Sequence, residues 1–148
     1  MHTNDLTATV SVTINASGNV VWKALTDPEA VKRYMFGATL VTDWKVGSPI
    51  AFKGEWKGKP YEDKGEVLQN DHGKRLSYTY WSSISGVEDK PENYGRVTYT
   101  LAAEGSGTKL TVTQAGAKDE AEKDKFQHNW QMLLESIKAQ LDSGSLTT

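Results

Sequence analysis

Residues 118–141 read KDEAEKDKFQHNWQMLLESIKAQL. The spacing of the apolar residues in this segment predicts a long helix that packs against a sheet. Counted from the first of them, six apolar side chains stand at offsets 0, 4, 7, 8, 11 and 15. At about 100° per residue, these positions form one stripe about 100° wide along a helix, as expected of a helix packed on a sheet. The six residues are Phe126, Trp130, Leu133, Leu134, Ile137 and Leu141. We therefore expect a long helix from Lys118 to Leu141 with this stripe buried.

The chain before this helix is expected to form an antiparallel meander. Apolar and polar residues alternate in six segments that are separated by turns rich in Gly, Lys, Asp and Glu. The segments are Ala38–Asp43, Pro49–Trp56, Tyr61–Asn70, Lys74–Trp81, Tyr94–Ala103 and Thr108–Ala115. The first turn is expected to take up residues 57–60. Near the N-terminus, Leu6–Ile14 alternates in the same way and predicts a further strand.

Two short helices are expected after that first strand. Ser17 has the side chain of an N-cap for a helix over Asn19–Thr26. A second helix follows at once and runs to about Met35. Its start carries Asp27 as a cap and Pro28 at the first helical position, and both agree with the preferences of a helix N-terminus.

Together these elements predict one α+β domain over residues 1–148, with a core at about 6–141 and a flexible tail at 143–148. A strongly bent antiparallel sheet wrapped around the long C-terminal helix is the arrangement that buries every apolar face. The connection from Ser82 to Asn93 is long and rich in Ser, Gly, Glu and Pro. We expect it to be either a functional lid or a mobile loop.

A sheet that curves around one helix leaves a hollow between them. Large residues of inward parity either line this hollow or fill it, namely Phe52, Trp56, Tyr78, Tyr80 and Tyr99. An empty apolar hollow of about 300 Å³ would cost roughly 7 kcal/mol, close to the whole stability of a domain. The space is therefore filled by side chains, wet, or occupied by a ligand. Buried tyrosine hydroxyls need partners, which favours a partly polar pocket over a sealed one.

The composition excludes several classes of function. The 148 residues include 17 Lys+Arg against 19 Asp+Glu, and this net charge of −2 argues against nucleic-acid binding. The chain has no Cys, which removes disulfides, thiolate metal sites and Cys nucleophiles. The first 16 residues show no signal-peptide pattern, and no apolar run approaches the roughly 20 residues that span a bilayer. We expect a cytoplasmic protein without membrane insertion.

No motif in the sequence predicts catalysis or metal binding. GEWKGK at residues 54–59 has the wrong glycine spacing for a phosphate loop and lies between two strands. The three histidines, His2, His72 and His128, are dispersed, and the helical position of His128 predicts that it faces solvent. Three carboxyls on predicted strands are expected at the surface: Asp43, Asp63 and Glu66. We expect no metal and no cofactor, and we name no catalytic residue.

Several motifs resemble, in order, those of one superfamily. VWKALTDPEA at residues 21–30 resembles the signature that opens the START-like (SRPBCC) superfamily, and WKVGSPI at residues 44–50 is similar to its entry into a strand. More narrowly, the chain resembles bacterial relatives of the activator of the heat-shock protein 90 ATPase. Further agreement is found at Gly58, GEV (65–67), RLSYT (75–79) and GTKLTV (107–112). The resemblance covers about residues 8–141.

Such a resemblance implies the helix-grip (START-like, Bet v-like) fold, with a cavity between the last helix and the sheet that relatives use for lipids, hormones or polyketides. Asn129 stands where the family often has Gly, which implies different packing at the cavity floor. The candidate cavity-lining residues are Met35, Phe36, Leu40, Phe52, Trp56, Tyr78, Tyr80, Tyr99, Trp130 and Leu134.

Three hypotheses about function follow. The first is non-catalytic binding of a small hydrophobic or amphipathic molecule, lipid-like, aromatic or polyketide-like, in the cavity. The second is a stress-related protein that interacts with a chaperone through the outer sheet face and the 82–93 loop. The third is an enzyme of cyclase or hydrolase type, for which the sequence offers no inward His and no evident carboxylate pair.

Overall fold

The computed structural model describes residues 6–35, 37–84 and 86–142, and it describes Trp56 by its backbone alone. Its helices and strands, in chain order, are β1 (Leu6–Ile14), α1 (Gly18–Thr26), α2 (Pro28–Tyr34), β2 (Thr39–Val41), β3 (Pro49–Trp56), β4 (Lys59–Asp71), β5 (Arg75–Ser82), the 3₁₀ turn η1 (Pro91–Asn93), β6 (Gly95–Glu104), β7 (Gly107–Ala117) and α3 (Glu120–Asp142).

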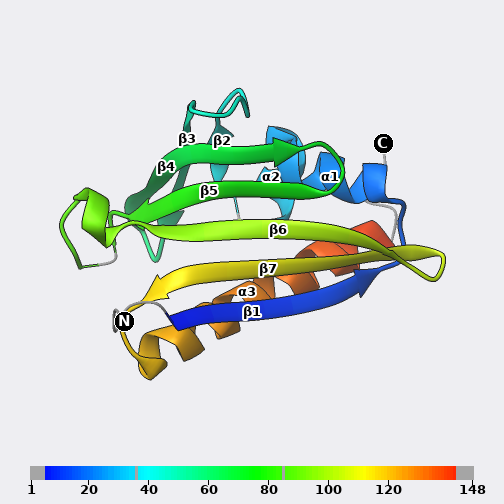
Figure 1. Cartoon of the computed structure of the whole chain (residues 1–148). Helices are drawn as coiled ribbons and strands as arrows, with labels where there is room; N and C mark the ends of the chain where they lie inside the picture. The colour runs from blue at the N-terminus through cyan, green and yellow to red at the C-terminus, as the bar shows by residue number, and fades with distance from the viewer. Residues whose placement is uncertain (1–5, 36, 85, 143–148) are drawn as a thin grey trace.

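The strands form one curved antiparallel sheet in the order β1-β7-β6-β5-β4-β3-β2. The first strand of the chain therefore pairs with the last, with Val10 opposite Val112. The long helix α3 lies along β7 and β1, while α2 packs against β2 and α1 contacts α2, β6 and β7 (Figure 1). This is the α+β helix-grip arrangement that the sequence predicts, and the prediction is confirmed.

The core lies between the sheet and α3. Trp130, Leu134, Ile137 and Leu141 of the predicted stripe are buried, whereas Phe126 and Leu133 at its edge are half-buried. The sheet faces them with fully buried side chains, which include Ile14, Leu76, Val97, Leu110 and Val112. The strand and helix faces that the sequence pattern predicts to be apolar are thus the faces that the structure buries.

Local signals set the boundaries of the short helices. The Ser17 hydroxyl accepts a hydrogen bond from the backbone N–H of Val20 at 3.3 Å, and the Asp27 carboxylate accepts one from Glu29 at 3.3 Å. Pro28 occupies the first turn of α2. These caps satisfy backbone N–H groups that a helix start leaves without partners, so both predicted starts are confirmed.

Several predicted boundaries are wrong by one or two residues, among them those of β2 and the start of β4. The strand expected over Ala38–Asp43 shortens to β2, Thr39–Val41. The turn expected over residues 57–60 is a two-residue hairpin, because Lys57 and Gly58 both have positive φ values, 52° and 79°. Two successive positive φ angles match the twist of the flanking strands, so β4 begins at Lys59 instead of after Pro60. Within the described residues, no helix combines the length and apolarity needed to cross a membrane.

Candidate functional site

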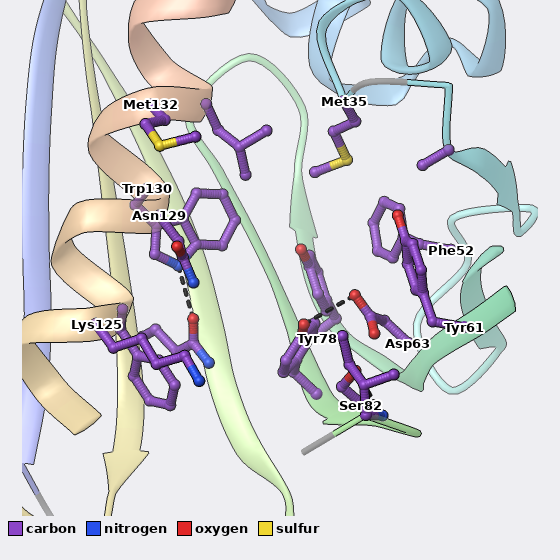
Figure 2. Close-up of a pocket in the computed structure, with 16 residues that line it drawn as sticks. Met35, Phe52, Tyr61, Asp63, Tyr78, Ser82, Lys125, Asn129, Trp130 and Met132 are labelled. Carbon is purple, nitrogen blue, oxygen red and sulfur yellow. Dashed lines mark hydrogen bonds between the residues drawn. The ribbon is translucent and has the colours of Figure 1, made fainter. Parts of the chain in front are cut away.

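A cleft of about 390 Å³ lies between α3 and the part of the sheet formed by β3, β4 and β5 (Figure 2). Its helix wall consists of Lys125, Phe126, Asn129, Trp130, Met132 and Leu133. Its sheet wall consists of Phe52, Tyr61, Asp63, Tyr78, Tyr80, Ser82 and Gln114, and Met35, Ala38 and Ile84 complete the rim. Ile84 and Met132 are 59% and 42% exposed, so the cleft is open to solvent and is not a sealed void.

Strand alternation aims the sheet wall at α3. Tyr61 and Asp63 share the parity of Val67, which is fully buried, so all three point to the same face of β4. On β5, Tyr78, Tyr80 and Ser82 point the same way by the same rule. Figure 1 shows that α3 lies along β7 and β1 and away from β3, β4 and β5. The cleft lies in the space between the helix and these three strands.

A layer of buried aromatic residues closes the inner end of the cleft. Trp130 donates a hydrogen bond from its indole Nε1 to Gln114 Oε1 at 2.7 Å, and its ring meets Tyr99 edge-on at 5.8 Å. The Tyr99 and Tyr78 hydroxyls are hydrogen-bonded at 3.1 Å. Burial raises the pKa of Tyr99 to about 12 and that of Tyr78 well above its ordinary value. Side chains therefore fill the space between α3 and the sheet under β6 and β7, and the cleft lies beside this filled part, toward β3, β4 and β5.

One corner of the cleft is polar. The Tyr80 hydroxyl donates a hydrogen bond to Asp63 Oδ2 at 2.8 Å, while Asp63 Oδ1, which is shielded from solvent, has no hydrogen-bond partner among the described residues. Burial raises the pKa of Asp63, and the neighbouring hydroxyls of Ser82 and Tyr80 offset this only in part. Burial also raises the pKa of Tyr80 far above its ordinary value, and the adjacent Asp63 charge raises it further. The corner thus holds a carboxyl group whose charged form is disfavoured by burial.

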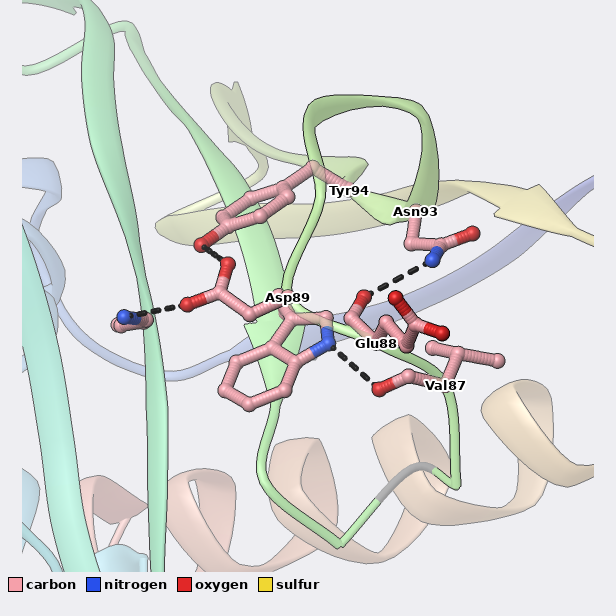
Figure 3. Close-up of polar contacts among 7 residues, drawn as sticks. Val87, Glu88, Asp89, Asn93 and Tyr94 are labelled. Atoms are coloured by element: carbon pink, nitrogen blue, oxygen red, sulfur yellow. Dashed lines mark hydrogen bonds and ion pairs between the residues drawn. The ribbon is translucent and has the colours of Figure 1, made fainter.

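The loop after β5 carries Ile84 to the cleft rim, and contacts on the outer face of the sheet hold its far end (Figure 3). The Trp81 and Tyr94 rings stack at 6.4 Å, and the Tyr94 hydroxyl donates to the Asp89 carboxylate. Asp89 also forms an ion pair with Lys64 at 2.6 Å. The loop is therefore fixed at one end, and its role as a lid stays a prediction.

The structure distributes the predicted cavity residues over three places. Met35, Phe52, Tyr78, Tyr80 and Trp130 line the cleft. Leu40, Tyr99 and Leu134 are buried in the core and are not among its lining residues. Phe36 lies outside the described residues, as does the side chain of Trp56.

Sequence reasoning missed much of the sheet wall, and its prediction for Asp63 is wrong. Asp63 was expected at the surface, but its side chain lines the cleft and is half-buried; Asp43 and Glu66 are exposed as expected. The available signal was parity, because counting back in twos from Val67 reaches Asp63 and Tyr61. Asn129, expected to affect the cavity floor, lines the cleft as an exposed side chain.

The histidines that the structure describes are His72 and His128. His128 is exposed on α3, as predicted, and the His72 ring lies 5.3 Å from the ring of Trp22. Among the residues that the structure describes, no group of three or more His, Asp or Glu side chains is placed to hold a metal ion.

Comparison with known proteins gives a family match over most of the chain. A family model described as "Activator of Hsp90 ATPase homolog 1-like protein" matches residues 15–142. No curated protein matches the chain significantly.

Solved structures share the fold. The solution structure of ChR145 from Cytophaga hutchinsonii is 44% identical, has a TM-score of 0.80, and is matched over 97% of both chains. The crystal structure of MLL2253 from Mesorhizobium loti is 24% identical, with a TM-score of 0.75 over 93% of this chain and 98% of that one. CalU16 from Micromonospora echinospora is 24% identical, with a TM-score of 0.70 over 88% and 73%. At these identities the last two show the fold alone.

Proposed function

This chain belongs to the family of Activator of Hsp90 ATPase homolog 1-like proteins, and on that premise we propose that it binds a small amphipathic or hydrophobic molecule in the cleft between α3 and the sheet. The observation that carries this proposal is the open cleft of about 390 Å³ with aromatic walls and one polar corner. Ligand sites in proteins are mostly apolar concavities of about 300–1,000 Å³ with a few polar groups that fix orientation.

The energetics of the cleft support an occupant. Because Ile84 and Met132 at its rim are exposed, the cleft is open to solvent, and water enters it when no ligand is bound. Apolar side chains of the helix wall that border this space, such as Phe126 and Leu133, are half-buried. A ligand that displaces this water buries apolar surface on both walls, at about 25 cal/mol for each Å² removed from water.

The proposed role is binding without catalysis. Of the sixteen lining residues, one is a carboxyl, Asp63, and one is an ammonium, Lys125, and they lie on opposite walls (Figure 2). None of the sixteen is a histidine, and no second carboxyl stands beside Asp63 to form an acid–base pair.

A blocked cleft tests the proposal. Titration with a neutral, environment-sensitive naphthylamine dye should show saturable fluorescence enhancement in the wild type. Leu133→Trp, which adds a large side chain to the cleft wall, should weaken dye binding at least about tenfold by occupying the volume. Gln131→Trp adds the same ring at an exposed position of α3 and serves as the matched control. Absence of dye binding, or equal weakening by both variants, would refute the proposal.

A second role, association with a chaperone, is supported by the description of the family alone. The surface that would serve it is the outer sheet face near Trp81 and Tyr94, with the loop that carries Asp89 (Figure 3). Purified protein added to a heat-shock protein 90 homologue should then change its ATPase rate, and Leu133→Trp should leave that change intact. No change in rate and no co-purification would count against this role.

A further inference from the structure

We infer that the cleft selects amines, because Asp63 and the aromatic rings around it form a site for a ligand's protonated amino group. This inference rests on the proposed function and specifies its ligand class. It predicts an amphipathic molecule with one cationic end, held at the β4–β5 corner, and an apolar body that lies against α3.

The Asp63 charge lacks a counter-charge in the ligand-free protein. The hydroxyls that stabilise its charge, those of Tyr80 and Ser82, are neutral, and no ion pair joins Asp63 to a Lys, Arg or His among the described residues. Lys125 lies on the opposite wall of the cleft with its side chain exposed to solvent. No cation contributes to the pKa of Asp63, which is raised by burial. When Asp63 is ionised, its negative charge therefore borders the cleft with no cation paired to it among the described residues.

Water compensates this charge poorly. Asp63 Oδ1 is shielded from solvent and has no partner among the described residues, so the carboxylate retains part of its desolvation penalty. A cation in the adjacent cleft reduces that penalty by Coulomb attraction across a medium of low dielectric constant, and it does not need to contact Oδ1 directly. A neutral ligand of the same shape offers no such compensation.

Aromatic rings near the carboxylate strengthen the preference for a cation. Tyr61, Phe52 and Tyr78 line the same wall, and the faces of such rings attract ammonium groups. The position of Tyr61 depends on Gly54 opposite it on β3, because a Cβ added to Gly54 would lie 2.6 Å from the Tyr61 hydroxyl oxygen. The absence of a side chain at residue 54 thus gives the Tyr61 ring its place beside the corner.

The helix wall is suited to the rest of such a ligand. Phe126, Leu133 and Met132 present apolar surface across the cleft from Asp63, and the mouth beside Met132 is open. A ligand with an apolar body and a single ammonium therefore matches both walls at once, whereas a purely apolar ligand leaves the carboxylate unpaired.

A matched pair of probes tests the inference. Tryptamine and tryptophol differ only in bearing an ammonium or a hydroxyl, and each would be used to displace the neutral naphthylamine dye at pH 7. In the wild type, tryptamine should displace the dye at a concentration at least about tenfold lower than tryptophol. Asp63→Asn should reduce this ratio to near one, because the amide keeps the shape of the side chain and removes its charge.

Two further variants control the experiment. Glu62→Gln removes the neighbouring carboxylate, which has the opposite parity on β4, and should leave the amine preference unchanged. Tyr61→Leu removes one ring face and should lower the preference without eliminating dye binding. Dye binding and circular dichroism show for each variant that the cleft and fold are retained.

The outcomes separate this inference from the proposed function. Equal displacement by tryptamine and tryptophol in a wild type that binds the dye overturns the amine selectivity and leaves the binding function standing. A preference that persists in Asp63→Asn also overturns it. If the wild type binds neither the dye nor either probe, the proposed function and the inference both fall.

Discussion

The indole Nε1 of Trp130 donates a hydrogen bond to Gln114 Oε1 at 2.7 Å, and both residues are buried. This bond connects the middle of α3 to β7 and fixes which edge of the Trp130 ring meets Tyr99. On one side of the ring the core is filled by aromatic side chains, and on the other side the cleft begins. The Trp130–Gln114 pair therefore sets the boundary between packed core and open space.

Removal of the acceptor should destabilise the protein. Gln114→Leu leaves the buried indole N–H without a partner, which costs about 1–3 kcal/mol. Trp130→Phe removes the donor, and the double variant should cost less than the sum of the two single variants because the first change already breaks the bond. Urea unfolding of the four proteins measures this coupling. Strict additivity would show that the bond contributes nothing.

Truncations on the two sides of the boundary should differ in cost. Tyr99 is 2% exposed within the packed half, so Tyr99→Ala should lower the free energy of unfolding by about 3–5 kcal/mol. Leu133 is half-buried at the cleft wall, and Leu133→Ala should cost less than about 2 kcal/mol, the lower end of the range for core leucines. Denaturant unfolding decides this, and a loss at Leu133 as large as that at Tyr99 would mean that the cleft is closed in solution.

A glycine in β4 should be intolerant of any side chain. A Cβ on Gly65 would lie 1.7 Å from the backbone oxygen of Thr79 on β5, so Gly65→Ala must push the two strands apart. We expect a loss of about 1–3 kcal/mol or more, as in overpacked cores. Gly18→Ala is the control, because no atom lies within 4 Å of its Cβ position and alanine favours the helix there. Equal thermal stability of the two variants would contradict the close approach of β4 and β5.

The buried carboxyl of Asp63 should make the free energy of unfolding of the unliganded protein depend on pH. Because burial raises the pKa of Asp63, the folded state holds this proton more tightly than the unfolded chain does. As the pH rises from the unfolded pKa of about 3.9 through the raised folded pKa, the wild type loses stability that Asp63→Asn does not lose.

We therefore expect the stability of Asp63→Asn relative to the wild type to improve as the pH rises from about 4 through the raised folded pKa of Asp63, and to level off above it. Urea unfolding at several pH values measures the difference between the two proteins. Exposed carboxyls with lowered pKa values, such as Asp43 and Asp142, are present in both and cancel in this difference. A difference that is flat, or that moves the other way, would place Asp63 in contact with water.

The sequence predicts most of this fold because its signals are local and repeated. Alternation places Tyr78, Tyr80 and Tyr99 on one face, helical spacing selects Trp130 and Leu134, and the motif beginning at Val21 resembles the family that the comparison confirms. Each of these signals depends on neighbours within a few residues, so it can be read without knowledge of the sheet order.

The candidate site was harder to predict because its geometry depends on how far α3 lies from each strand of the sheet. Tyr99 and Tyr80 point to the same face of the sheet. Because α3 packs against β7 and β1, however, Tyr99 is enclosed and Tyr80 lines the cleft. No local sequence pattern predicts the distance between α3 and the strands that line the cleft. The prediction for Asp63 was wrong for a different reason. The segment Lys59–Glu66 has few apolar residues, so its inward-facing positions are recognised only by counting back in twos from Val67.

The pairing of β1 with β7 has a consequence for biosynthesis. Ser11 lies opposite Thr111, 100 positions later, so β1 emerges from the ribosome long before β7, the strand with which it pairs in the described sheet. At about 5–20 residues per second, that delay lasts roughly 5–20 s. During this interval β1 lacks the strand with which it pairs, which makes closure of the sheet a late step in folding.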